Sequence, residues 1–297
     1  MGTQVLQYIL SGVTTGSVYA IVGIGFNIIY NSTGIINFAQ GEFLMLGGMI
    51  AVSLQGILPM PAGIAVAVVA TGVVGVLVQL VFLSWLKNPG VLRMIIITIG
   101  LSILIREAAL HVWDEKVHAL AYWSGDETSS LAILGARVSP QVLWVLGISA
   151  LMVAGLTLFF RATLTGTAMR ACAGNTTAAR LCGIRAPALV TLSFFIAAAM
   201  GALAGCVISP ITQTQYDMGT SLAVKGFTCA VLGGLGNVTA AVAAGVLVGV
   251  LEAASISILP LAYKDVVALT IMLAILLFRP EGLFGGDGKR PASAVRR

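Results

Sequence analysis

Charged residues are scarce in this sequence. They make up 9% of its 297 residues, whereas an average soluble domain carries about 25%. So few charges cannot cover the surface of a water-soluble globule of this length. The scarcity therefore excludes a cytosolic enzyme, a nucleic-acid-binding protein and a disordered regulator. The formal net charge of +5 does not indicate a basic patch, because the positive residues stand between apolar runs and in the tail.

Several sequence signals are missing as well. No Lys or Arg precedes Lys87, so no positively charged n-region of a cleaved signal peptide is indicated. The G-x-x-x-x-G-K-[ST] phosphate loop and the catalytic patterns H-E-x-x-H and G-x-S-x-G do not occur. We therefore expect no ATP binding, no catalysis and no cofactor in this chain. The four cysteines lack metal-ligand spacing and are interpreted as small packing residues.

Apolar and small residues are abundant instead. Hydrophobic residues make up 58% of the chain, and 35 glycines are spread through the apolar runs, as in packed membrane helices. Because a spanning helix needs about 20 apolar residues, these runs predict an all-α polytopic membrane protein with one transmembrane domain over residues 1–297. The candidate spans are roughly Leu6–Tyr30, Gly41–Ile57, Ala62–Trp85, Met94–His111, Gln141–Phe160, Ala188–Ser209, Asp217–Gly233, Val238–Ile258 and Leu261–Phe278.

The positive charges predict the side of the membrane that each loop occupies. Segment 161–187 carries four arginines and no acid, and the tail 279–297 carries five basic residues, so both are expected in the cytoplasm. The apolar sequence between segment 161–187 and the tail is long enough for four spans, which is the even number that leaves the least of it unused. Lys87 and Arg93 place their loop inside, which puts the acidic loop 112–140 and the N-terminus outside. These constraints favour nine spans, or eight if the late runs are merged.

Two short spans begin in a similar way. The segments Ile36–Glu42 and Gln213–Asp217 each follow a long apolar helix, and each leads into a span that reaches a Gly-Gly pair. Under the predicted topology the two spans run in opposite directions. Inverted repeats with interrupted short helices of this kind are common in transporters. Chance similarity between two helices rich in glycine and leucine is the alternative.

Segment 161–187 has the pattern of two short helices on the cytoplasmic face. Residues Gly166–Ala171 predict the first helix, and Asn175 is a natural N-cap for a second over Thr176–Cys182. Gly183 then stands at the C′ position. A shaped basic surface with exposed Met169 and Leu181 would suit protein docking, whereas an ordinary positive-inside loop needs arginines but no capped helices.

Four stretches resemble motifs of the branched-chain amino-acid ABC transporter permeases, in the order of that family. They are INFAQGEFLMLGG at Ile36–Gly48, GTAMRACAGNTTAARLCGI at Gly166–Ile184, GGLGNVT at Gly233–Thr239 and RPEGLFG at Arg279–Gly285. The resemblance covers the chain end to end and is to the first of the family's two paralogous permeases. One departure is the pair Thr176–Thr177, which stands where the family often has acidic residues and puts the polar contacts to an ATPase in doubt.

The resemblance implies a heteromeric importer in a bacterial inner membrane, with an inverted-repeat permease fold. Its partners would be a paralogous second permease, two cytosolic ATPases that bind the ATP and magnesium, and a periplasmic substrate-binding protein. Segment 161–187 would be the coupling element that contacts the ATPases. The residues that the resemblance assigns to this contact are Gly166, Met169, Arg170, Ala171, Arg180, Gly183 and Ile184.

Polar residues near the starts of the two short spans are the candidates for the transport path. Glu42 is the one acid in the first 86 residues. With Asn37 and Gln40 it lines the path or fixes the broken helix; a carboxylate in the first turn of a helix is also favoured by the helix dipole. At the outer mouth we expect contact with the binding protein from Gln213, Gln215, Tyr216 and Asp217.

The sequence therefore predicts the permease of an ATP-driven importer for branched-chain or related amino acids. In this hypothesis closure of the ATPases moves the coupling element, and two permeases alternate between outward- and inward-open states. The alternative is an ion-coupled secondary transporter with Glu42 or Glu252 as its ion site. For Glu252 we expect an ion pair with Lys264 across the turn at Pro260.

Overall fold

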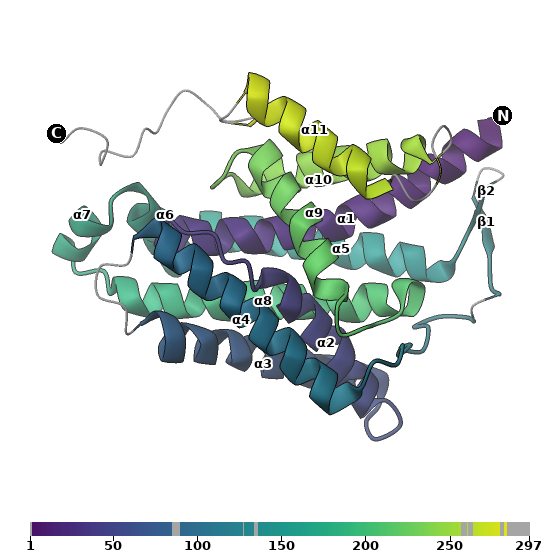
Figure 1. Ribbon diagram of the computed structural model, residues 1–297, viewed down its shortest axis with the longest axis horizontal. Helices are drawn as coiled ribbons and strands as arrows, with labels where there is room; N and C mark the ends of the chain where they lie inside the picture. Colours follow the sequence, from purple (N-terminus) through teal and green to yellow (C-terminus); the bar gives the residue numbers. More distant parts are fainter. Residues whose placement is uncertain are drawn as a thin grey trace.

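The computed structural model describes residues 2–84, 90–126, 128–133, 136–256, 260, 264–279 and 282–283. Along these residues the chain is almost entirely helical, with one short hairpin (Figure 1). The helices before the hairpin are α1 (Gly2–Thr33), α2 (Gln40–Leu54), α3 (Met60–Val78), which continues as the π-helical turn η1 (Gln79–Leu83), and α4 (Val91–Trp113). The elements that follow are β1 (Leu131–Ile133), β2 (Ala136–Val138), α5 (Pro140–Ala162), α6 (Leu164–Gly174), α7 (Thr176–Leu181), α8 (Ala186–Thr212), α9 (Met218–Gly233), α10 (Val238–Ser255) and α11 (Lys264–Phe278).

Each of the nine predicted apolar runs coincides with a helix. Six of these helices, α1, α3 with η1, α4, α5, α8 and α10, are long and apolar enough to cross a membrane. Helices α2 and α9 are shorter and apolar, as the polar breaks before them predicted. The all-helical membrane architecture is therefore confirmed, whereas the number of crossings stays a prediction. The predicted tail 279–297 falls largely outside the described residues.

The helices pack in two matching sets. Helix α1 lies along α10 as α8 lies along α3, and α2 packs on α8 as α9 packs on α1. Helices α1 and α8 touch directly, and so do the two short helices α2 and α9. Exchanging α1, α2 and α3 for α8, α9 and α10 therefore reproduces these pairings. Helix α5 contacts α1 and α8, between the two sets.

Small residues make this packing possible. A Cβ atom added to Gly16 of α1 would lie 2.6 Å from the backbone oxygen of Gly245 in α10. In the matching contact, a Cβ added to Gly75 of α3 would lie 2.6 Å from the side chain of Ala198 in α8. Backbones approach this closely only where side chains are absent or small, as in membrane helix pairs.

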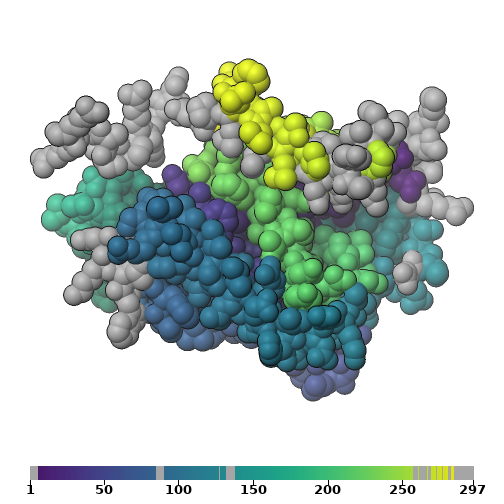
Figure 2. Space-filling view, in the orientation of Figure 1, coloured from purple at the N-terminus to yellow at the C-terminus, as the bar shows by residue number. Residues whose placement is uncertain are grey.

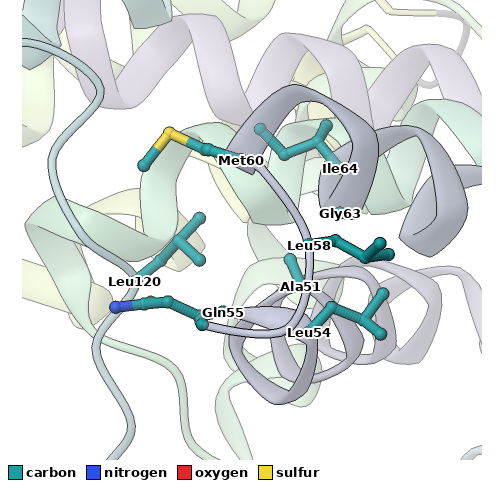
Figure 3. A pocket seen from close by; sticks show the side chains of 9 residues that line it. Ala51, Leu54, Gln55, Leu58, Met60, Gly63, Ile64 and Leu120 are labelled. Carbon is teal, nitrogen blue, oxygen red and sulfur yellow. The ribbon is translucent and has the colours of Figure 1, made fainter.

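The loop 112–140 is fastened to the ends of neighbouring helices. His118 and Thr214 exchange backbone hydrogen bonds of 2.9 and 2.7 Å, which ties this loop to the connection between α8 and α9. The side-chain oxygen of Gln55 accepts a hydrogen bond from the Ala121 amide at 3.2 Å. Leu120 lines a small pocket together with residues from the end of α2 and the start of α3 (Figure 3). The loop 112–140 therefore packs against two connections, the one between α2 and α3 and the one between α8 and α9.

Candidate functional site

The starts of the two short helices meet inside the helical bundle. A Cβ atom added to Gly219 of α9 would lie 2.8 Å from the backbone oxygen of Gly41 in α2, and one added to Gly41 would lie 2.6 Å from Ala223. The two backbones are in direct contact at this point, with the side chains of Glu42 and Ala223 beside them. The positive ends of both helix dipoles therefore converge on one place, as in transporters built from discontinuous helices.

This meeting point lies well away from the ends of the long helices. The side-chain amide of Gln40 donates a hydrogen bond of 3.0 Å to the Ala197 carbonyl of α8 and abuts Gly25 of α1. Gly25 stands eight residues before α1 ends, a distance of about 12 Å along a helix. The chain after α1 thus turns back into the bundle before α2 begins. Similarly, Thr214 packs against Gly48, so the chain before α9 also runs inward along α2.

Glu42 occupies the meeting point. Its side chain is fully buried, and its Oε1 atom accepts hydrogen bonds from Ser102 of α4 at 2.8 Å and from Thr220 of α9 at 3.3 Å. Its Oε2 atom has no hydrogen-bond partner among the described residues. The carboxylate lies in the first turn of α2, as predicted. Glu42 links three helices through side chains, and the helix dipole is only one part of its environment.

Asn37 and Gln40 are also fully buried beside the start of α2. The Asn37 side-chain oxygen accepts a hydrogen bond from the Ala39 amide at 3.2 Å, which shapes the turn into the helix. Among the described residues, Asn37 Nδ2 and Gln40 Oε1 have no hydrogen-bond partner. Buried polar atoms without partners are rare in folded proteins and often mark a place for water or ligand. The structure therefore brings the three predicted path residues together.

Helix α9 presents a polar stripe at the surface of the chain. The polar residues Thr220 and Ser221 are exposed, and on the same face they are flanked by exposed Asp217, just before the helix, and by exposed Val224. In the space-filling view α9 reaches the surface between α4 and α11 (Figure 2). The Thr220 and Ser221 hydroxyls donate within the chain, to Glu42 and to the Met218 carbonyl. The exposed Asp217 carboxylate, however, is costly to place against hydrocarbon and calls for water or another protein beside this end of α9.

The four candidates at the outer mouth lie just before this stripe. Gln213, Gln215 and Asp217 are exposed, and Tyr216 is half-buried. Gln213 has a positive φ of 59°, at the point where the chain leaves α8. The exposure of these side chains agrees with a docking role. Their contact with a binding protein stays a prediction.

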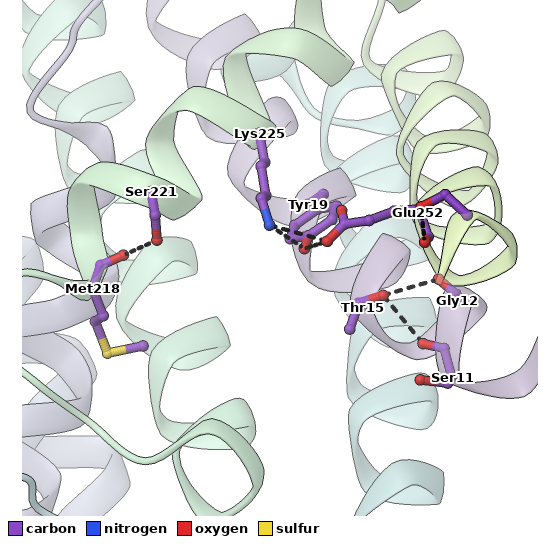
Figure 4. A network of polar contacts seen from close by, with 9 residues as sticks. Ser11, Gly12, Thr15, Tyr19, Met218, Ser221, Lys225 and Glu252 are labelled. Atoms are coloured by element: carbon purple, nitrogen blue, oxygen red, sulfur yellow. Dashed lines mark hydrogen bonds and ion pairs between the residues drawn. The ribbon is translucent and has the colours of Figure 1, made fainter. Parts of the chain in front are cut away.

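A second polar cluster, missed by the sequence reasoning, joins α1, α9 and α10 (Figure 4). The Lys225 ammonium lies 3.0 Å from Glu252 Oε1 and donates to the Tyr19 hydroxyl at 3.1 Å. Tyr19 in turn donates to Glu252 at 3.2 Å. The expected partner of Glu252, Lys264, has a side chain outside the described residues. The sequence signal that could have revealed this ion pair was a single lysine, Lys225, in one apolar run and a single glutamate, Glu252, in the next.

Segment 161–187 forms the two predicted short helices. Thr163 caps α6 by accepting a hydrogen bond from the Gly166 amide at 3.0 Å. Asn175 caps α7 through the Ala178 amide at 3.0 Å, which confirms its predicted N-cap role. Gly183 has a φ of +82°, as expected at a C′ position. The helix pair therefore has a defined shape at the end of the molecule (Figure 1).

The surface of this helix pair is basic with exposed apolar side chains. Leu164 and Leu181 are 91% and 85% exposed, and the arginines of the segment are exposed as well: Arg161, Arg170, Arg180 and Arg185. The prediction that Met169 is exposed was wrong, because its side chain is 1% exposed in the main apolar core. Met169 faces inward because α6 packs closely on α5, where a Cβ added to Gly166 would lie 2.7 Å from Phe160 Cα.

The other predicted coupling residues divide by exposure. Ala171 and Gly183 are exposed, and Ile184 is half-buried. Ile184 packs against the small apolar cluster of Cys172, Ala179 and Ala186, which holds α6, α7 and α8 together. Met169, Gly166 and Ile184 therefore support the shape of the pair, whereas the arginines and Ala171 form its outer surface.

Two of the family-like motifs meet at the turn between α9 and α10. Asn27 accepts a hydrogen bond from the Gly236 amide at 2.8 Å, and Asn31 donates to the Gly236 carbonyl at 3.0 Å. From the segment after α11, the Leu283 amide donates to the Leu232 carbonyl at 2.7 Å. Side chains of α1 and the backbone near the C-terminus thus hold this turn in place.

Long apolar helices, combined with two short helices that each follow a polar break, define a polytopic membrane protein of the transporter type. Comparison with known proteins makes this specific. The chain belongs to the family described as "Branched-chain amino acid transport system / permease component", whose model matches residues 8–276. The resemblance found in the sequence is therefore confirmed, and the family is one of transport permeases.

Curated relatives support this assignment. The chain is 33% identical to the high-affinity branched-chain amino acid transport system permease protein BraD of Pseudomonas aeruginosa, over 94% of this chain and 95% of the relative. The same identity and coverage apply to the protein LivH of Escherichia coli K12. Among solved structures, PsaBC from Streptococcus pneumoniae in complex with Fab has a TM-score of 0.51 at 11% identity, over 94% of this chain and 92% of that chain. The names of BraD and LivH support a transport permease and do not favour the ion-coupled alternative, whereas the likeness to PsaBC concerns the fold alone.

Proposed function

We propose that this chain is the permease subunit of an ATP-driven importer for branched-chain or related amino acids. The observation that carries the proposal is the capped helix pair α6–α7, whose basic surface with exposed Leu164 and Leu181 suits docking of a separate protein. Its partners would be a paralogous permease, two cytosolic ATPases that bind ATP and magnesium, and a periplasmic binding protein. The cargo class comes from the names of the relatives.

The proposed topology has nine spans in an inner membrane. The N-terminus is outside and the C-terminus cytoplasmic, as the positive loops indicate. The matching neighbours of α1–α3 and α8–α10 support an inverted repeat, with α5 as the helix between the halves. In this topology four spans, α2 to α5, lie between α1 and α8, and an even number between them gives the two halves opposite directions in the membrane.

The proposed path runs along the stripe of α9, in front of the meeting point of α2 and α9. The exposed polar side chains Thr220 and Ser221 would face water between this chain and its partner permease. Movement of α6–α7 by the ATPases would tilt the helices around this point between outward- and inward-open states. Such coupling requires that ATP and cargo each bind the two states with different affinity.

The proposal is tested by purifying the tagged chain from native membranes in mild detergent. We expect one second permease and two ATPases to copurify, and reconstituted liposomes to take up leucine only with ATP and the binding protein. Arg170→Ala should leave assembly of the permease pair intact but reduce ATP-driven uptake, because Arg170 is exposed on the proposed contact surface. Lys116→Ala, an exposed cation in the loop 112–140, is the matched control and should not reduce it. Transport by the chain alone without ATP would overturn the proposal.

A further inference from the structure

The ion pair between Lys225 and Glu252 is costly to place inside a membrane helix bundle. Each charge loses its hydration, and a buried pair is often no more stabilising than apolar residues of the same size. Charged residues inside membrane segments accordingly mark functional sites more often than structural ones. The pair is also joined to Tyr19, so that three helices share one polar cluster (Figure 4). Its presence calls for a role beyond holding the helices together.

Lys225 lies at the edge of the polar stripe of α9. It follows Val224 directly and stands one helical turn after Ser221, both of which are exposed. The Lys225 side chain is 11% exposed, whereas that of Glu252 is 2% exposed. The ammonium is thus the end of the pair nearer to the open side of the stripe. A lysine side chain is long and flexible enough to move its charge by several ångströms without moving its helix.

We propose that Lys225 receives the carboxylate of the transported amino acid in exchange for the carboxylate of Glu252. The exchange replaces one carboxylate partner by another, so the ammonium is never left without a counter-charge. The Tyr19 hydroxyl donates to Glu252 and accepts from Lys225 in the structure. Its bond to Glu252 can therefore persist when Lys225 turns toward the stripe, and the Glu252 carboxylate keeps a donor.

The chemistry on the other side of the stripe fits the second charge of an amino acid. Thr220 donates to Glu42, whose Oε2 atom has no hydrogen-bond partner among the described residues. The Glu42 carboxylate thus lies behind one edge of the stripe, and the Lys225 ammonium lies behind the other edge. This arrangement is complementary to a zwitterion with an ammonium and a carboxylate group. The inference rests on the proposed amino-acid cargo and deepens it by naming the group that recognises the carboxylate.

The test uses the assembled permease–ATPase complex without nucleotide, with Ser221→Cys as a reporter and Cys182→Ser to remove an exposed native thiol. A charged, water-soluble methanethiosulfonate should label Ser221→Cys, and leucine at about four times its dissociation constant should slow labelling about fivefold. The probe 3-methylbutylamine, which is leucine without its carboxylate, should not slow it. Val69→Cys, an exposed apolar position of α3, controls for labelling outside the path.

The decisive variant replaces both charges, as Lys225→Gln with Glu252→Gln. It removes both charges of the pair together, so it should assemble and still label at Ser221→Cys, but leucine should no longer protect. Lys225→Arg keeps the cation and should retain protection. If the pair is only structural, the double variant keeps full protection by leucine, which would overturn the inference.

Failure of the inference can be told apart from failure of the proposed function. Intact ATP-driven leucine uptake without any protection of Ser221→Cys by leucine would refute the role of Lys225 and leave the importer standing. An unreactive Ser221→Cys in a complex that transports leucine would do the same, because the stripe would then not face water. Absence of leucine uptake with all partners present would refute the cargo and the inference together.

Discussion

Replacing Gly219 with alanine should disrupt the meeting point of α2 and α9. The added Cβ would lie 2.8 Å from the Gly41 backbone oxygen and 2.6 Å from Glu42 Oε2. The carboxylate can turn aside, but the backbone oxygen cannot. To restore an ordinary contact distance of 3.4 Å, the two helices must separate by about 0.6 Å. The hydrogen bond from Thr220 to Glu42, already 3.3 Å long, would then be lost.

The expected cost follows from these contacts. Overpacking of this kind costs about 1–3 kcal/mol. Because Gly41 and Gly219 are in contact in this conformation, the substitution destabilises this conformation relative to the other alternating state. A shift of about 1–3 kcal/mol changes the ratio of two alternating states by about 5- to 150-fold. We therefore expect ATP-driven leucine uptake to fall severalfold, in a complex that still assembles but unfolds at a lower temperature.

The assay compares Gly219→Ala with Gly147→Ala in α5. A Cβ at Gly147 meets nothing within 4 Å, so this control gains helix propensity, worth up to about 1 kcal/mol, without any clash. Uptake into liposomes and the thermal midpoint of the complex would be measured for both variants. Equal uptake and equal midpoints for the two would refute the reasoning that direct backbone contact between α2 and α9 is required.

Three further predictions concern the helix pair α6–α7 and the α9–α10 turn. Asn175→Ala removes the cap of α7 at a cost of about 1 kcal/mol and should weaken ATP-driven uptake, whereas Asn175→Asp should retain it. Met169→Ala should lower the stability of the complex by about 2–5 kcal/mol, while Leu181→Ala should leave stability unchanged and reduce copurification of the ATPases; equal stability of the two would contradict the buried position of Met169. Asn27→Ala leaves the Gly236 amide without its acceptor, and faster proteolysis of the α9–α10 turn would reveal it.

The elements that the sequence predicted well are those with local signals. Asn175 and Gly183 mark the start and end of α7 through the chemistry of helix caps, and both lie where they were expected. The polar breaks before the two short helices likewise predicted α2 and α9. Long apolar runs are a strong signal in a membrane protein, because the bilayer leaves few alternatives to a helix.

Contacts between distant segments could not be predicted in this way. The partners of Glu42, which are Ser102 and Thr220, come from helices 60 and 178 residues further along the chain. Lys225 was overlooked because its counter-charge lies on the next helix, and Lys264 was the nearer choice in sequence. Met169 was expected to be exposed because the pattern of a short basic helix does not reveal which side packs against α5.

Helix α1 is synthesised before the helices that it packs against most, which come late in the chain. Its most extensive packing is against α8, α9 and α10, and Ser32, Asn27 and Tyr19 hydrogen-bond to residues of the second half. It is the least apolar and most enclosed of the six long spans. At about 5–20 residues per second, the ribosome needs about 10–40 s between the end of α1 and the start of α10. During synthesis the polar groups and small residues of α1 must therefore wait without their partners until α10 has been made.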